Sequence, residues 1–187
     1  MNSFAKADVL AACAQYGLQL NLPAADDGTT LDGAKLMAAF ASNESSMGAN
    51  CGPRHEPAYD VGGFLATGAQ QAGLLNTYGS AAACSYGPWQ MMFVNFQDHN
   101  VNDLLTSLDI CAQEFVRYFN SYVITVRKAS NLNEMGQCWN AGHISANPAP
   151  GVVAYCNNLQ TAYDLQNPAP PQPDASATVQ AAPPADS

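Results

Sequence analysis

Apolar residues recur at every third or fourth position along most of this chain, which is the spacing of α-helices that bury one face. The strongest segment runs from Asn100 to Arg127, and Asn100 is a suitable N-cap residue for it. We predict that this segment forms one central helix of the core. Its apolar face comprises Val101, Leu104, Leu105, Leu108, Cys111, Ala112, Phe115, Phe119 and Tyr122.

Shorter periodic segments predict further helices around the central one. Thr30 is the expected N-cap of the helix predicted over residues 30–43, and Gly142 is expected to end the helix predicted over residues 131–140. No stretch alternates convincingly between apolar and polar residues, as a half-buried strand does. We therefore expect a mainly α-helical chain. The predicted helices cover residues 4–16, 30–43, 61–78, 91–97, 131–140 and a last segment that begins at Pro150.

Composition divides the 187 residues into two parts. Residues 1–166 are long enough for one domain with a sizeable core, which carries a long loop-rich insertion after residue 44. Residues 167–187 are rich in Pro and Ala, so we expect a flexible tail that cannot build a core. No apolar run approaches the ~20 residues that a transmembrane helix needs.

The charge of the chain limits the classes of partner. The net charge is −9, and only six residues are Lys or Arg. Nucleic acids and anionic membranes are bound through clusters of basic residues, so we expect neither as a partner. A polysaccharide is compatible with this charge, because sugars are bound through hydroxyl hydrogen bonds and aromatic faces. We expect a monomer.

The six cysteines contain no C-x-x-C pair, which argues against a zinc ribbon or a thioredoxin-like motif. They predict either buried free thiols or disulfides formed in an oxidising compartment, with Cys51 and Cys84 as the favoured pair. The N-terminus does not have the pattern of a signal peptide. We expect an extracellular or periplasmic protein whose signal was removed, or which reaches its substrate by another route such as cell lysis.

Glu44 is the most informative single residue. It follows the apolar stretch 30–43 and begins a polar turn, in a chain of which only 11% is charged. Loss of solvent raises the pKa of a carboxyl group, and an acid that is still protonated near neutral pH can deliver a proton. Glu44 therefore meets the condition for a general acid.

Three short segments, far apart in the sequence, stand out together, and the first contains Glu44. They are Glu44-Ser45-Ser46-Met47, Tyr86-Gly87-Pro88-Trp89-Gln90-Met91-Met92 and Cys138-Trp139-Asn140-Ala141-Gly142. In order and rough placement they resemble the E-S, G-L-M-Q and Y-N-A-G motifs of the soluble lytic transglycosylase and goose-type lysozyme family. A last helix with Val152, Val153, Tyr155 and Tyr163 matches as well, so the resemblance covers about residues 30–165.

The resemblance implies a lysozyme-like helical fold and cleavage of the β-1,4 bond between N-acetylmuramic acid and N-acetylglucosamine in peptidoglycan. It implies that Glu44 protonates the glycosidic oxygen, and that Gln90 and Asn140 contact the substrate or shape its groove. Trp139 stands where the family has tyrosine; an indole can still donate one N–H and form an apolar wall.

A second departure is the long insertion between Glu44 and Gly87, which holds the polar cluster from Arg54 to Asp60. An inverting hydrolase needs a second carboxylate, about 6.5–9.5 Å from the first, to activate water. Glu56 and Asp60 are the candidates, and the alternative for both is a solvated loop with an Arg54–Glu56 ion pair. A lytic transglycosylase needs only one acid, so the sequence leaves the two outcomes open.

The sequence also bears on cofactors, on alternative functions and on the residues that would bind a substrate. The scattered histidines His55, His99 and His143 indicate no metal site, and no cofactor motif is present. A chitin-type glycosidase and a non-catalytic cell-wall-binding module on the same fold stay open as alternatives. The expected substrate-binding residues are Ser46, Tyr86, Gln90, Trp139, Asn140 and Tyr155.

Overall fold

The computed structural model describes residues 3–24, 30–97 and 100–166, so the predicted tail lies outside the described residues. These residues form a mainly helical chain, as predicted, with seven α-helices and a small sheet in the described part. The helices are α1 (Lys6–Gly17), α2 (Gly33–Ser45), α3 (Ala69–Tyr78), α4 (Val101–Thr106), α5 (Leu108–Tyr118), α6 (Leu132–Ala141) and α7 (Pro150–Asp164). The strands are β1 (Arg54–His55), β2 (Cys84–Tyr86) and β3 (Met91–Met92).

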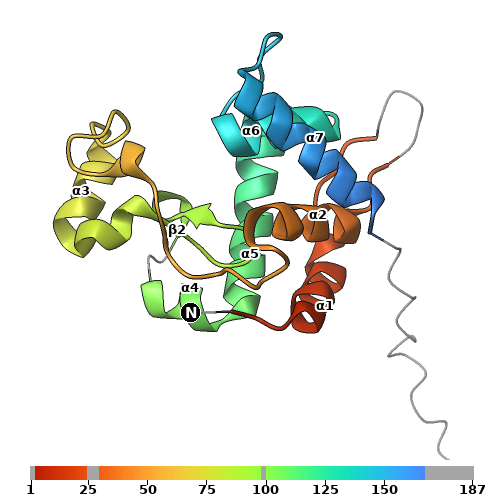
Figure 1. The fold of residues 1–187 in the computed structure, drawn as a ribbon, viewed down its shortest axis with the longest axis horizontal. Coiled ribbons are helices and arrows are strands. Elements are labelled where there is room, and N and C mark those ends of the chain that lie inside the picture. Colours follow the sequence, from red (N-terminus) through yellow and green to blue (C-terminus); the bar gives the residue numbers. More distant parts are fainter. Residues whose placement is uncertain (1–2, 25–29, 98–99, 167–187) are drawn as a thin grey trace, which may run out of the picture.

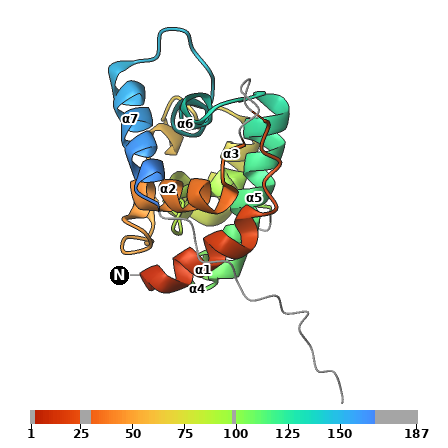
Figure 2. The same ribbon diagram turned by 90° about the vertical axis from the view of Figure 1, so that its right-hand side faces the viewer.

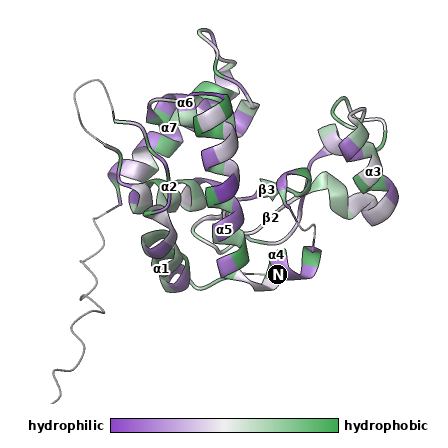
Figure 3. Cartoon of the chain, turned by 180° about the vertical axis from the view of Figure 1, so that it is seen from behind, coloured by the Kyte–Doolittle hydropathy of each residue, from purple (hydrophilic) through white to green (hydrophobic). Residues whose placement is uncertain are grey.

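Helix α5 runs through the middle of the molecule and continues as a π-helix over Phe119–Val126 (Figure 1). Helix α1 packs on α2 and on α5, α2 packs on α7, and α7 packs on α6 (Figure 2). The part that contains α3 stands apart from these helices and forms a second lobe (Figure 1). Strands β2 and β3 lie between α5 and this lobe (Figure 3).

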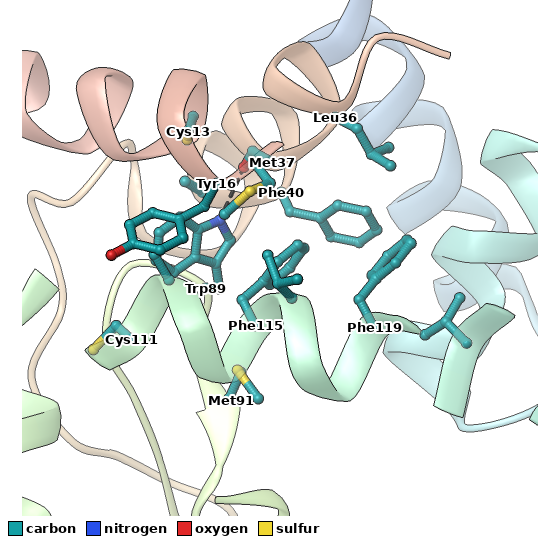
Figure 4. Packing of buried hydrophobic residues seen from close by; sticks show 14 of the residues in the cluster. Cys13, Tyr16, Leu36, Met37, Phe40, Trp89, Met91, Cys111, Phe115 and Phe119 are labelled. Carbon is teal, nitrogen blue, oxygen red and sulfur yellow. Dashed lines mark hydrogen bonds between the residues drawn. The ribbon is translucent and has the colours of Figure 1, made fainter. Parts of the chain in front are cut away.

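The centre of the helical lobe is a cluster of aromatic side chains. Phe40 of α2 meets Phe115 and Phe119, with ring centroids 5.8 and 5.7 Å apart, and Trp89 lies 5.3 Å from Phe115. The Trp89 indole donates a 2.9 Å hydrogen bond to the carbonyl oxygen of Met37, so its one polar group is satisfied inside the core (Figure 4). The segment around residue 89 is thereby fixed to α2.

The predicted central helix is interrupted. Asn100 is the N-cap, as predicted, and its side chain accepts from the amides of Asn102 and Asp103. Ser107 then leaves the helical conformation at φ −112° and ψ 106°. Its hydroxyl accepts from the amide of Ile110 and caps α5, which begins at Leu108. A serine that bonds a nearby amide favours such a cap over a helix interior. The prediction of one helix from 100 to 127 is therefore wrong.

Four further predictions of local structure need correction. Residues 91–97 do not form the predicted short helix, because Met91–Met92 is strand β3 and only a 3-10 turn over Phe93–Asn95 follows it. Residues 61–68 are not helical, and Gly62 takes φ +83° there. The N-cap of α2 is Asp32, which accepts from the amide of Lys35, rather than Thr30. A sheet of order β1-β2-β3 is present with both pairs antiparallel, although no strand was expected. Strands of two or three residues are too short to show an alternating pattern.

The six cysteines are buried and carry free thiols in the structure. The thiol of Cys51 donates to the carbonyl oxygen of Gly48 at 3.1 Å, and that of Cys84 to the carbonyl oxygen of Ser80 at 3.4 Å. Burial raises the pKa of Cys13 and of Cys111 to about 12, so both stay protonated at neutral pH. Within the described ranges, no helix combines the length and the apolar character needed to cross a membrane.

Helices α1 and α2 meet at two glycines, Gly17 and Gly33. A Cβ atom added to Gly33 would lie 2.1 Å from the carbonyl oxygen of Gly17, which is backbone and cannot move aside. We expect Gly33→Ala to lower the free energy of unfolding by about 2 kcal/mol or more. Chemical denaturation measures this change. A matched control is Gly151→Ala in α7, where the added atom meets nothing within 4 Å and the change should be neutral or slightly stabilising. Equal effects of the two variants would contradict the close crossing.

Candidate active site

Glu44 lies in the last turn of α2, and its side chain is only 8% exposed. The hydroxyl of Tyr155, on α7, donates a 2.6 Å hydrogen bond to Glu44 Oε1. The two residues are 111 positions apart in the sequence, and the packing of α2 on α7 brings them together. A tyrosine hydroxyl and a buried carboxyl group thus form the first contact of the site.

The other oxygen of Glu44 faces the sheet. Arg54 Nη2, on β1, lies 3.5 Å from Glu44 Oε2, and Arg54 Nε donates to Glu56 Oε1 at 2.8 Å. A single guanidinium therefore lies between the two carboxyl groups. The Arg54–Glu56 pair expected from the sequence is present, but it is not isolated in a solvated loop, because the same arginine reaches Glu44.

The hydrogen-bonded groups continue from Glu56 to the second sequence motif. Ser85 Oγ lies 3.4 Å from Glu56 Oε1 and 3.0 Å from Gln90 Oε1, so its one proton can be donated to either oxygen. We call the resulting series the polar chain. It comprises Tyr155, Glu44, Arg54, Glu56, Ser85 and Gln90.

Burial is the dominant influence on Glu44 and raises the pKa of its carboxyl group above the ordinary value of 4.5. Hydrogen bonds from Tyr155, Arg54 and the Trp139 indole, together with the charge of Arg54, lower this pKa and offset only part of the rise. Burial and the neighbouring Glu44 raise the pKa of Tyr155 well above 10, so its hydroxyl remains a donor. The site therefore favours a protonated Glu44 at a pH where an exposed glutamate is ionised.

A cleft of about 750 Å³ lies between the two lobes, next to the polar chain. Glu56, Gln90 and Trp139 line it, whereas Glu44 is not part of the lining: it lies next to Trp139 and is joined to Glu56 through Arg54. The floor and walls carry many aromatic and amide groups. The lining residues include Tyr59, Phe64, Leu65, Met91, Met92, Asn95, Tyr118, Tyr122, Arg127, Asn140, Gly142 and His143.

The third sequence motif forms one wall of this cleft. Trp139 is half-buried, and its ring packs 4.9 Å from Phe115 and 5.2 Å from Phe40. The core thus holds the indole in place while part of it faces the cleft. Asn140 follows at the exposed end of α6 and presents its amide to the cleft. Gly142 ends α6 in the left-handed conformation at φ +74°, where glycine is favoured.

Other expected site residues lie elsewhere or have structural contacts. Tyr86 is 2% exposed and donates to the carbonyl oxygen of Ala81, and it does not line the cleft. Ser46 is exposed and ends α2 at φ +54°, outside the cleft lining. Gln90 lines the cleft but donates to the carbonyl oxygen of Gly87 at 2.9 Å, so its amide braces the turn. Asp60 pairs with His55 at 3.0 Å and does not join the polar chain.

Sequence reasoning missed several residues of the cleft. Tyr118 and Tyr122 stack with ring centroids 5.2 Å apart, and both line it. Their spacing of four residues on a helix was the available signal, but Tyr122 was assigned to the core face. The Tyr122 hydroxyl donates to the carbonyl oxygen of Gly142 at 2.8 Å and joins the π-helix to the third motif.

Among residues 3–24, 30–97 and 100–166, no three His, Cys, Asp or Glu side chains gather in a way that could hold a metal ion. No family model matches this chain, and no match to it was found among curated proteins or solved structures.

Tyr155→Phe removes a hydrogen bond that favours the ionised form of Glu44. We therefore expect the pKa of Glu44, followed by NMR titration of its side-chain carbon, to be above 4.5 in the wild type and higher still in the variant. A matched control is Tyr163→Phe on the same helix, whose hydroxyl accepts from the amide of Asp32 and does not touch Glu44. A downward shift in Tyr155→Phe, or an equal shift in the control, would show that the hydroxyl does not act on Glu44.

Proposed function

We propose that this chain is a glycosidase with a lysozyme-like fold, and that it cleaves the β-1,4 bond between N-acetylmuramic acid and N-acetylglucosamine in peptidoglycan. One observation carries the proposal. Glu44 of the first motif, a buried carboxyl group with a raised pKa, lies against Trp139, which lines a cleft of about 750 Å³ where residues of the second and third motifs meet. The fold assignment rests on this meeting and on the helical architecture, and the site of action follows as extracellular or periplasmic.

In the proposed reaction, the protonated Glu44 donates its proton to the glycosidic oxygen as the bond to the anomeric carbon breaks. This step leaves a carboxylate in a site from which water is largely excluded. Tyr155, Arg54 and the Trp139 indole then stabilise the new charge, because each acts on the Glu44 carboxyl group as a donor. Donors that are already in place need no reorganisation when the charge develops.

The cleft lining suits a saccharide. Its volume of about 750 Å³ lies within the range of about 300–1,000 Å³ that is typical of ligand sites. Tyr118, Tyr122 and Trp139 contribute aromatic surface to the lining, and Asn140 and Asn95 carry amides that can bond hydroxyl and N-acetyl groups. Because Glu44 does not line the cleft, the glycosidic oxygen has to reach it past Trp139, the lining residue that acts on it.

Glu56 favours hydrolysis over transglycosylation as the outcome. It lines the cleft, and its Oε1 is held by Arg54 while its Oε2 has no partner in the described part of the chain. We propose that Glu56 takes a proton from a water molecule as the water oxygen bonds to the anomeric carbon. Asp60 is less suited, because it pairs with His55 away from the polar chain. Without this base, attack by the 6-hydroxyl of the sugar would give anhydro ends.

Glu44→Gln keeps the shape of the side chain and an oxygen that accepts from Tyr155, but it cannot donate an acidic proton. We expect it to lower kcat for peptidoglycan cleavage by about 100-fold or more, with little change in KM. Release of soluble fragments from cell walls measures this effect. The wild-type rate should fall as the pH rises through the pKa of Glu44, which lies above 4.5, because the ionised form has no proton to give.

The control for this experiment is Glu134→Gln, which changes a glutamate that bonds Ser130 at the start of α6. This variant should keep its activity. Full activity of Glu44→Gln would refute the proposed function, and binding of cell walls by the wild type without cleavage at any pH would indicate a non-catalytic module instead.

The role of Glu56 has a separate test. Glu56→Gln should slow the reaction by about 100-fold, while Asp60→Asn should remain close to the wild type. Mass spectrometry of the wild-type products should find reducing ends. Anhydro ends, together with an active Glu56→Gln variant, would overturn hydrolysis but leave Glu44 as the acid.

A further inference from the structure

Two of the three arginines of the chain line the cleft or the groove that adjoins it, and the third bonds the lining residue Glu56, although the net charge is −9. Arg54 belongs to the polar chain, and Arg127 lines the cleft. Arg117 lines a second groove of about 390 Å³, which shares Asn95, Tyr118 and Tyr122 with the cleft. In an acidic protein this concentration of guanidinium groups indicates an anionic part of the ligand.

Two of these arginines are neutralised by the protein itself. Arg54 contacts Glu44 and Glu56, and Arg117 pairs with Glu114 at 2.7 Å and also donates to the carbonyl oxygen of Asn95. Arg127 has no carboxylate partner among residues 3–24, 30–97 and 100–166. Arg127 is therefore the one of the three arginines whose charge is free to pair with an anionic group of a ligand.

The protein holds Arg127 in a fixed place. Its Nε and Nη2 donate to the Tyr122 hydroxyl at 2.9 and 2.5 Å, and the guanidinium lies 4.9 Å from the centre of the Tyr122 ring. The Tyr122 hydroxyl is fixed in turn by its bond to Gly142. These contacts occupy one side of the guanidinium fork. The remaining N–H groups have no acceptor in the described part of the chain, and Arg127 is exposed.

We propose that Arg127 binds a carboxylate of the substrate and thereby selects peptidoglycan over an uncharged amino-sugar polymer such as chitin; this inference rests on the proposed function. A guanidinium fork matches the planar geometry of a carboxylate, and such charge-assisted bonds are stronger than neutral ones. N-acetylmuramic acid supplies two sources of carboxylate. One is the lactyl group when it carries no peptide, and the other is the peptide stem attached to that group.

Three substrates distinguish these sources. The first is intact peptidoglycan, the second is glycan freed of its peptides by an amidase, and the third is the same stripped glycan with its lactyl carboxyl groups reduced to alcohols. Arg127→Gln should lower kcat/KM by about tenfold on at least one of the first two, mainly through KM, since it removes a charge-assisted hydrogen bond to the substrate. It should match the wild type on the third.

Loss on intact peptidoglycan alone assigns the stem carboxylate, and loss on the stripped glycan assigns the lactyl carboxylate. Lys128→Gln is the matched control, because it removes the same charge from the next residue, which does not line the cleft, and it should behave as the wild type. Arg127→Lys should recover only part of the loss, because it keeps the charge but not the planar pair of N–H donors.

Equal activity of Arg127→Gln and the wild type on all three substrates, or an equal loss in Lys128→Gln, would overturn the inference. A wild type that cleaves none of the three would instead refute the proposed function.

Discussion

The site depends on the placement of one carboxyl group, that of Glu44, between a tyrosine on one helix and an arginine on a strand. Burying a carboxyl group disfavours its ionised form, so a protein retains such a group only where donors surround it. Tyr155 holds Oε1 at 2.6 Å, and Arg54 approaches Oε2 at 3.5 Å. The two donors come from α7 and β1, so the packing of the helical lobe and its junction with the sheet must both be correct before Glu44 has its properties.

Contacts elsewhere in the fold fix the position of α2, which carries Glu44. The aromatic cluster around Phe40 and Phe115 fixes α2 against α5, and the Trp89 indole ties the second motif to Met37 of α2. The end of α2 is set by Ser45, whose hydroxyl donates to the carbonyl oxygen of Ala41 and accepts from the amide of Gly48. The chain therefore turns away from the helix directly after Glu44. Gly142 performs the same function at the end of α6, next to Asn140.

Sequence reasoning found what local periodicity determines, and it missed what distant contacts determine. The helices around Met135 and Leu159 were predicted, because apolar spacing is visible in the sequence. The rise in the pKa of Glu44 through loss of solvent was also expected, because this acid directly follows an apolar stretch. The break at Ser107 was missed, since the apolar pattern continues across it. The pairing of Arg54 with Glu44, and the burial of Tyr86 away from the cleft, depend on how the sheet meets the helices. These contacts between the sheet and the helices cannot be read from the residues of any single segment.

The most direct test of the account is a crystal structure of the Glu44→Gln variant with a bound peptidoglycan tetrasaccharide. The account predicts that the sugar lies in the cleft lined by Trp139 and Asn140, and that one glycosidic oxygen is within hydrogen-bond reach of residue 44, about 2.6–3.2 Å. A saccharide bound outside this cleft, or bound within it with every glycosidic oxygen beyond the reach of residue 44, would show that Glu44 is not the proton donor.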